Sequence, residues 1–305
     1  MEKIIVFGHK SPDTDTICSS LVMADLQTKI RGEEVVACRL GELNEETKYA
    51  LKHFDIEAPK YIESVEEGQR VMLVDHNEFS QSVEGIEKAK IEAVVDHHRI
   101  NNFETSEPLF YYAQPVGCTS TILFELYSSN NIEIPAQMAG LMLSAIISDT
   151  LLLKSPTTTE KDKKALEALA KIADVDVNIY GLEMLKAGTN LDKYTEDELI
   201  RLDAKKIEKE DIKYVIAQVN TVSIPDILKR KEKIEQEINK EILAKGLSLF
   251  VFVITDIINS NSEAIVLGDR TDVIAKSYEI KDNIAVMPGV VSRKKQVLPL
   301  VEKNM

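Results

Sequence analysis

The N-terminal half of the chain alternates short apolar runs with longer stretches that repeat apolar residues at helical spacing. Runs rich in β-branched residues predict strands at residues 3–8, 35–38, 70–75, 91–95 and 109–112. Helical patterns lie at residues 17–30, 45–54, 117–128 and 136–148. Strands that alternate with helices in this way are typical of an α/β domain with a doubly wound, mainly parallel sheet.

The pattern changes near residue 188. Two amphipathic helices, predicted at residues 159–172 and 177–185, precede a segment that breaks the helical periodicity. We expect a first domain over residues 1–188, a hinge linker at 189–195 and a second domain over 196–305. The second domain should be a smaller α/β unit, with strands at 203–208, 213–219, 247–255 and 262–267 and a long charged helix at 224–245.

Three of the predicted strands end in the same kinds of side chain. The first leads to His9, Asp13 and Asp15, the second to Asp75 and His76, and the third to Asp96, His97 and His98. Open α/β sheets build their sites at the carboxyl ends of strands. Carboxylates buried together there are costly unless cations lie among them, so we expect a multinuclear metal site. Each group taken alone also fits ordinary polar residues at a strand end, and the acids of residues 11–16 fit a helix cap.

Two further positions in the first domain carry information. Asp149 ends a helix that is apolar nearly all round, and a carboxylate at a helix C-terminus opposes the helix macrodipole. Metal ligation explains Asp149 better than a surface acid does. The sequence Gly-Cys-Thr-Ser at residues 117–120 begins a helix whose N-terminus could hold an anion, although capping explains these residues equally well.

The composition excludes several classes of function. The formal charge of −14 over 305 residues disfavours a general nucleic-acid-binding surface. Cys18, Cys38 and Cys118 have no CxxC spacing, so they indicate neither a disulfide framework nor a cysteine zinc site and fit a reducing cytoplasm. No apolar run has the length that a membrane helix needs. We therefore expect a cytoplasmic protein with no nucleic-acid or membrane partner.

Six side chains form the candidate ligand set: His9, Asp13, Asp15, Asp75, His97 and Asp149. Imidazoles among carboxylates indicate a transition metal, and Mn²⁺ suits the carboxylate excess best. With one shared carboxylate, such a set can hold two cations about 3.5–4 Å apart, where a bridging water loses its proton and becomes a nucleophile. A basic run at residues 293–295 fits a solvated surface or a phosphate site. The combination predicts hydrolysis of a phosphoester or phosphoanhydride.

These motifs together resemble a known superfamily. The sequence at residues 9–16, the strand ending in Asp75, the triplet at 96–98 and Ser-Arg-Lys-Lys at 292–295 look like those of the DHH phosphoesterases. The last motif is much more specific to one branch, the manganese-dependent (family II) inorganic pyrophosphatases. The chain resembles that family over essentially its whole length.

The resemblance implies roles for individual residues. It implies one Mn²⁺ on His9, Asp13 and Asp75, and a second on Asp15, Asp75, His97 and Asp149, with Asp75 bridging the two. It implies that the substrate phosphates contact His98, Lys205, Arg293 and Lys294, and that His98 also assists the leaving group. We interpret Asp96 as a partner that orients a ligating histidine.

The resemblance also implies an activity and a setting. The expected reaction is hydrolysis of inorganic pyrophosphate to two phosphates by a metal-bridging hydroxide. The expected site is a cleft between an N-terminal DHH domain and a smaller DHHA2-type domain. A cytoplasmic homodimer is expected, with Mg²⁺ joining the site together with substrate and Co²⁺ able to replace Mn²⁺.

Two alternatives remain open from the sequence. Another DHH phosphoesterase would act on short oligonucleotides, cyclic dinucleotides or polyphosphate, but a glycine-rich element would then be expected where this chain has an Arg-Lys pair. A non-catalytic metal-dependent binding protein would have the same fold. The intact ligand set favours an enzyme over that second alternative.

Overall fold

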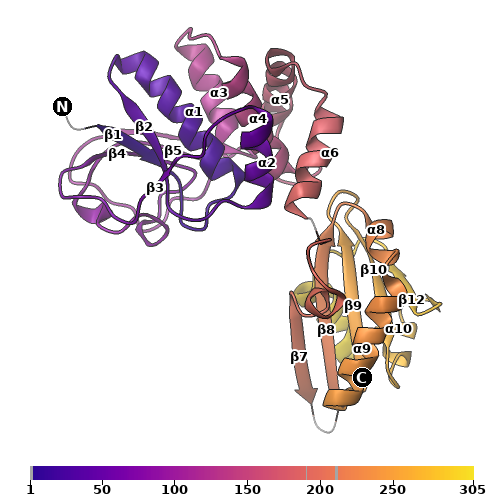
Figure 1. Ribbon diagram of the computed structural model, residues 1–305. Coiled ribbons are helices and arrows are strands. Elements are labelled where there is room, and N and C mark those ends of the chain that lie inside the picture. The colour runs from indigo at the N-terminus through magenta and orange to yellow at the C-terminus, as the bar shows by residue number, and fades with distance from the viewer. Residues whose placement is uncertain (1–2, 190, 210–211) are drawn as a thin grey trace. The chain divides into compact units, whose positions relative to one another are not determined.

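A computed structural model describes residues 3–189, 191–209 and 212–305, without the side chains of Lys209 and Lys294 (Figure 1). The chain divides into two compact units, Met1–Gly188 and Thr189–Met305. Residue 190, within the predicted linker, lies outside the described residues. Among the residues described, no helix combines the length and the apolar character that crossing a membrane requires.

The first unit is built on a six-stranded sheet in the order β3-β2-β1-β4-β5-β6. All neighbouring strands in it are parallel. The strands are β1 (Ile4–Phe7), β2 (Val35–Arg39), β3 (Lys60–Tyr61), β4 (Arg70–Val74), β5 (Lys90–Asp96) and β6 (Phe110–Ala113). The order reverses between β1 and β4, which confirms the doubly wound parallel sheet and marks the position where such sheets bind ligands.

Six α-helices belong to the described part of this unit. They are α1 (Thr14–Arg31), α2 (Glu45–His53), α3 (Thr119–Ser129), α4 (Ala136–Thr150), α5 (Glu160–Ala173) and α6 (Val177–Gly188). Figure 1 shows α1, α3 and α4 grouped beside the sheet, with α5 next to α4. The middle of α4 is buried because its residues are apolar on every side, as predicted.

The opposite face of the sheet is covered differently. Phe7, Leu73 and Val94 pack there against Val83 and Ile86, which come from the connection between β4 and β5. That connection contains only short 3₁₀ helices, Phe79–Gln81 and Ile86–Lys88. Burial of each large apolar side chain contributes about 1.5–3 kcal/mol, so this thin cover still stabilises the sheet.

The second unit has a mixed sheet in the order β11-β12-β10-β9-β8-β7, in which β8 and β9 are parallel and the other pairs are antiparallel. Its strands are β7 (Ala204–Lys209), β8 (Ile212–Thr221), β9 (Leu249–Asp256), β10 (Asn261–Leu267), β11 (Ile280–Lys281) and β12 (Ile284–Met287). Its helices are α7 (Glu196–Leu199), α8 (Ile224–Leu228), α9 (Lys231–Lys245), α10 (Asp272–Ala275) and α11 (Leu298–Asn304), with a π-helical turn at Arg293–Val297. Apolar clusters cover both faces of this sheet, confirming a second α/β unit.

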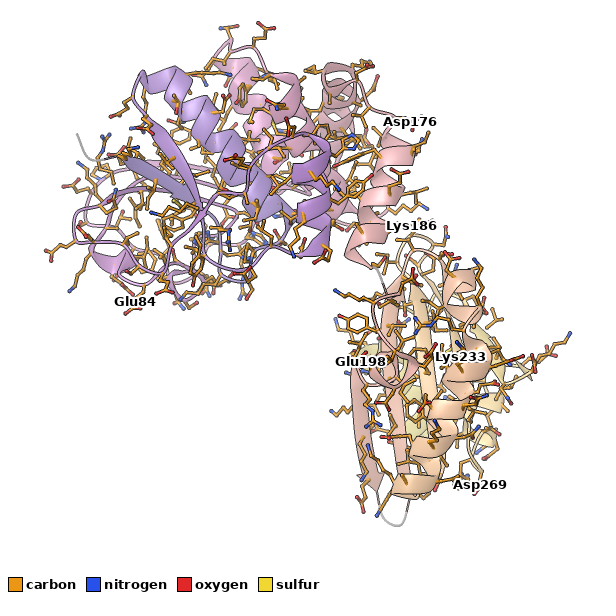
Figure 2. All side chains as sticks on the ribbon, in the orientation of Figure 1. Glu84, Asp176, Lys186, Glu198, Lys233 and Asp269 are labelled. Carbon is orange, nitrogen blue, oxygen red and sulfur yellow. The ribbon has the colours of Figure 1, made fainter. Side chains whose placement is uncertain are left out.

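The prediction of a single helix at residues 224–245 is wrong. It is two helices, α8 and α9, separated at Lys229 and Arg230. The amide of Arg230 bonds to Ile227 O in a tightened turn, and its guanidinium donates to the carbonyls of Leu191 and Tyr194. The break therefore depends on tertiary contacts. In Figure 2, Lys233 marks the first turns of α9.

Candidate metal centre

The turn between β1 and α1 supplies three of the candidate ligands. Asp13 is the N-cap of α1, where its Oδ1 accepts from Thr16 N at 2.9 Å, while its Oδ2 lies 3.4 Å from His9 Nε2. Asp15 lies in the first turn of α1 and is completely buried. The capping and ligand interpretations are compatible, because each uses a different oxygen of Asp13.

Asp75 follows β4 directly and lies between the two imidazoles. Its Oδ2 is 3.5 Å from His9 Nε2, and its Oδ1 is 3.4 Å from His97 Nε2. Its backbone has a φ of 58°, a left-handed conformation that is uncommon for residues other than glycine and that clusters at functional sites. Thr16 Oγ1 donates to Oδ2 at 2.6 Å and Thr119 Oγ1 donates to Oδ1 at 3.1 Å. Each carboxylate oxygen therefore faces a different histidine.

His97 follows β5 and is oriented through its other ring nitrogen. Its Nδ1 lies 3.0 Å from Val116 O, as the Nδ1 of His9 lies 2.7 Å from Lys10 O. Because a carbonyl only accepts, each Nδ1 carries the hydrogen, and Nε2 is left as the ligand atom. The Nε2 of His97 is 3.7 Å from Asp149 Oδ2, at the end of α4.

The structure brings all six candidate ligands together. Ligand atoms of His9, Asp13 and Asp75 lie within 4.8 Å of one another, and so do those of Asp15, Asp75, His97 and Asp149. We call these the first and second ligand groups; Asp75 belongs to both. A cavity of about 570 Å³ opens at this position, lined in part by Asp13, Asp75, His97 and Asp149. Another cavity, of about 690 Å³, lies near the start of β5 and has none of the candidate ligands in its lining.

The histidines and carboxylates of the two ligand groups shift one another's pKa values. Burial opposes a charged imidazole, but hydrogen bonds with Asp13 and Asp75 outweigh it and raise the pKa of His9 to about 11. Burial likewise opposes protonation of His97, but Asp75 and Asp15 raise its pKa to about 9. Burial and the charge of Asp75 raise the pKa of Asp15 to about 6.

The other two carboxylates respond in opposite directions. Burial, followed by the charge of Asp15, raises the pKa of Asp149 well above its usual value. Burial also opposes ionisation of Asp75, but hydrogen bonds from His9 and His97 outweigh it and lower its pKa. Most of these side chains therefore hold protons more tightly than usual, because the buried carboxylates need positive charge beside them. Divalent cations would supply that charge and displace the protons, so the donor set fits metal ions. The mixed N/O donors suit a transition metal.

His98 belongs to a neighbouring network. Asp96, which is completely buried, accepts from His98 N and lies 3.0 Å from His98 Nδ1, and Asn77 donates to its other oxygen at 2.7 Å. The hydrogen bond that His98 Nδ1 donates to Asp96 raises the pKa of His98. The partner of Asp96 is thus His98, which was expected to contact substrate, and none of the six predicted ligands. His98 Nδ1 also lies 3.6 Å from Asp75 Oδ1, and Asp75, His97 and His98 form a further group that could hold a metal ion, so the interpretation that Asp96 orients a ligating histidine stays a prediction. His98 lines the same cavity as the ligands.

The remaining predicted site residues lie in the second unit. Lys205 is exposed on β7. The guanidinium of Arg293 is 3.0 Å from Asp203 Oδ1, and its backbone N donates to Gln218 Oε1 at 2.8 Å. A hollow of about 280 Å³ is lined by Asp203, Gln218, Asn220, Val291, Ser292 and Arg293. The Lys294 side chain lies outside the described part of the chain.

Sequence reasoning missed the groups that hold the ligands in place. Ser19 Oγ donates to Asp15 Oδ1 at 2.6 Å, and Thr119 N donates to Asp15 Oδ2 at 2.7 Å. Ser19 could have been found, because it stands four residues after Asp15 on the same helix face. The N-terminus of α3, for which anion binding and capping had equal support, holds the carboxylate of Asp15.

Both units match known protein-family models. Residues 3–146 match the DHH family, N-terminal domain, and residues 182–304 match the DHHA2 domain. A probable manganese-dependent inorganic pyrophosphatase of Exiguobacterium sp. is 54% identical over 304 residues, covering 99% of this chain and 98% of that relative. This chain belongs to the manganese-dependent inorganic pyrophosphatase family. The predicted resemblance is confirmed.

Other members of the manganese-dependent inorganic pyrophosphatase family are similarly related. A probable member from Brevibacillus brevis is 53% identical over 304 residues, with 99% of this chain and 98% of the relative covered. A solved Methanococcus jannaschii structure, assigned to the family II inorganic pyrophosphatases, has a TM-score of 0.63 and 39% identity and covers 99% of both chains. The similarity therefore spans both units.

The pKa shifts predict how metal removal changes stability with pH. The folded-state pKa values of His9 and His97, about 11 and about 9, exceed the ordinary value of 6.5. The stability that these two protonated imidazoles contribute is therefore complete below pH 6.5 and is lost as the pH rises through the folded-state pKa values. The raised pKa of Asp15, about 6 against 3.8, acts in the same direction between those values. We expect the thermal unfolding midpoint of chelator-treated protein to fall from pH 6.5 to 9. The increase in midpoint on adding Mn²⁺ should grow over the same range, and an increase independent of pH would contradict this prediction.

Proposed function

We propose that this protein hydrolyses inorganic pyrophosphate to two phosphates with the help of two Mn²⁺ ions. The carrying observation is that Asp75 presents one oxygen toward each of the two ligand groups. Four carboxylates, those of Asp13, Asp15, Asp75 and Asp149, supply four negative charges when ionised, and two divalent cations would balance them. Relatives named as pyrophosphatases over nearly the full length support the choice of substrate.

The first ion would be held by His9, Asp13 and Asp75, and the second by Asp15, Asp75, His97 and Asp149. When bound, such ions supply Lewis-acid charge and lower the pKa of a coordinated water, which makes it a nucleophile near neutral pH. The protein contributes a fixed arrangement of metal-binding atoms. The Nδ1 atoms of His9 and His97 are hydrogen-bonded to backbone carbonyls, so their Nε2 atoms face the other ligands.

His98 is our candidate for the group that acts on the departing phosphate. Asp96 accepts from it, which favours the protonated imidazole, and the ring lines the cavity beside the ligands. We assign to His98 binding of a substrate phosphate and donation of a proton to the leaving oxygen. A protonated leaving group departs more readily, which is the usual contribution of a general acid.

The second unit would bind the anionic ends of pyrophosphate. Arg293, Lys205 and Lys294 are assigned to this role, because cations in a partly enclosed site stabilise phosphate charge that develops during transfer. The two units, with residues 189–195 as a hinge, are proposed as catalytic and substrate-binding domains. We also propose a cytoplasmic homodimer, Mg²⁺ that joins with substrate, and Co²⁺ as a substitute for Mn²⁺.

A substrate panel tests this function. Purified protein in Mn²⁺ should release phosphate from pyrophosphate at least about a hundredfold faster than from triphosphate, a dinucleotide or a nitrophenyl ester. A site that fits a small phosphate group rejects larger substrates whose additional groups find no partners in it. Comparable turnover of the dinucleotide would favour another DHH phosphoesterase. No product from any of the four, in protein that binds Mn²⁺, would favour a binding protein.

A further inference from the structure

Asp162, in the first turn of α5, is a completely buried carboxylate that belongs to neither ligand group. It forms a capping box with Thr159: Thr159 N donates to Asp162 Oδ2 at 2.7 Å, and Asp162 N donates to Thr159 Oγ1 at 3.4 Å. A capping box needs only this reciprocal pair and works at the surface of a protein. At α7 the same motif, made by Thr195 and Glu198, is exposed; Glu198 is labelled in Figure 2.

Asp162 differs from Glu198 in its additional partners. Gly117 N donates to its Oδ2 at 2.9 Å, and Thr121 Oγ1 donates to its Oδ1 at 2.6 Å. The approach to Gly117 needs a glycine, since a Cβ there would lie 2.9 Å from Asp162 Oδ2 and 2.8 Å from Thr150 Cγ2. The carboxylate on α5 is therefore bonded to the turn that precedes α3.

This segment, residues 116–119, ends in the first residue of α3 and forms hydrogen bonds with three members of the second ligand group. Val116 O accepts from His97 Nδ1 at 3.0 Å. Thr119 N donates to Asp15 Oδ2 at 2.7 Å, and Thr119 Oγ1 donates to Asp75 Oδ1 at 3.1 Å. The segment thus fixes the ring of His97 and the carboxylates of Asp15 and Asp75.

We propose that Asp162 is a positioning residue for the second ligand group and acts through the segment at 116–119. This inference rests on the metal binding in the proposed function. Groups that orient metal ligands commonly change metal affinity by about 10–100-fold when removed. Asparagine at position 162 would keep the volume but remove the negative charge that strengthens the hydrogen bonds from Gly117 N and Thr159 N to Oδ2. Its NH₂ fits only on the side of Thr121, whose hydroxyl would have to accept instead of donating.

Mn²⁺ titration of chelator-treated protein tests this role without relying on activity. In a His9→Gln background, in which the first group is disabled, Asp162→Asn should weaken Mn²⁺ binding by about 10–100-fold. In an Asp149→Asn background, in which the second group is disabled, the same change should have less than a threefold effect. Thr159→Ala is the matched control, because it removes the helix cap and leaves the bonds to Gly117 and Thr121. It should lower the thermal unfolding midpoint with Mn²⁺ affinity unchanged.

Several outcomes would overturn the proposal. Unchanged Mn²⁺ affinity in Asp162→Asn, or equal weakening by Thr159→Ala, would leave Asp162 with helix capping alone. If Asp162→Asn does not fold, Thr121→Val decides, since it removes one partner of the carboxylate: weaker binding in the His9→Gln background supports the role and unchanged binding rejects it. If the role of Asp162 is rejected while the unsubstituted protein (the parent) hydrolyses pyrophosphate, the proposed pyrophosphatase function still stands. A parent that binds Mn²⁺ but cleaves no pyrophosphate fails only the proposed function, and a parent that binds no Mn²⁺ fails both.

Discussion

Replacing Asp75 by alanine is expected to abolish pyrophosphate hydrolysis and to weaken Mn²⁺ binding at both ligand groups. The two oxygens of this carboxylate lie 3.5 Å from His9 Nε2 and 3.4 Å from His97 Nε2, so a single truncation removes a donor from each group. We expect the rate of phosphate release to fall by more than about a thousandfold, because residues that act as a unit fail together. Phosphate release and bound Mn²⁺, measured by elemental analysis, report the two effects separately.

Asp96→Asn is the matched control for Asp75→Ala. Asp96 is also completely buried at the carboxyl end of a neighbouring strand, but it belongs to neither ligand group and bonds to His98 and Asn77. Its loss should reduce turnover through His98 and leave Mn²⁺ content near that of the parent. Normal Mn²⁺ content in Asp75→Ala would reject the bridging carboxylate. Equal metal loss in both variants would mean that any change of charge at this edge disrupts the cluster.

The convergence of candidate ligands from β1, β4 and β5 could be predicted because strand ends follow a simple rule. Carboxyl ends of neighbouring parallel strands meet at one edge of the sheet, so His9, Asp75 and His97 converge once the strands are recognised. Asp149 was predicted as a ligand for a different reason, since a carboxylate at the C-terminal end of a helix opposes the helix macrodipole and metal ligation explains it better. Both arguments need only local sequence and the fold class.

The supports of the ligands could not be predicted in the same way. Thr119 bonds to Asp15 across 104 positions of sequence, and Asp162 bonds to Gly117 across 45. These contacts depend on how α3 and α5 pack, and the sequence near either residue is explained equally well by helix capping. The interruption at Arg230 was missed for a similar reason, because its guanidinium bonds to carbonyls nearly forty residues away.

Arg293→Ala is expected to impair pyrophosphate binding strongly with Mn²⁺ content unchanged. The side chain is only 18% exposed, is held by Asp203, and lines a hollow of about 280 Å³. Its backbone is also fixed, since its N donates to Gln218 Oε1. Loss of a charge-assisted, preorganised contact to phosphate should lower kcat/KM by about 10²–10³-fold. Steady-state phosphate release gives kcat and KM, and elemental analysis gives the Mn²⁺ content.

Lys295→Ala provides the control, because it removes the same charge from the same basic run in a chain whose formal charge is −14. The Lys295 side chain is exposed, and its backbone N donates to Ser292 Oγ at 3.2 Å. Its loss should therefore change kcat/KM less than threefold if the geometry of Arg293 matters. Arg293→Lys should fall between the parent and Arg293→Ala, since an ammonium retains charge but cannot form the planar two-pronged contact. Equal effects of Lys295→Ala and Arg293→Ala would instead assign the run to general attraction of anions.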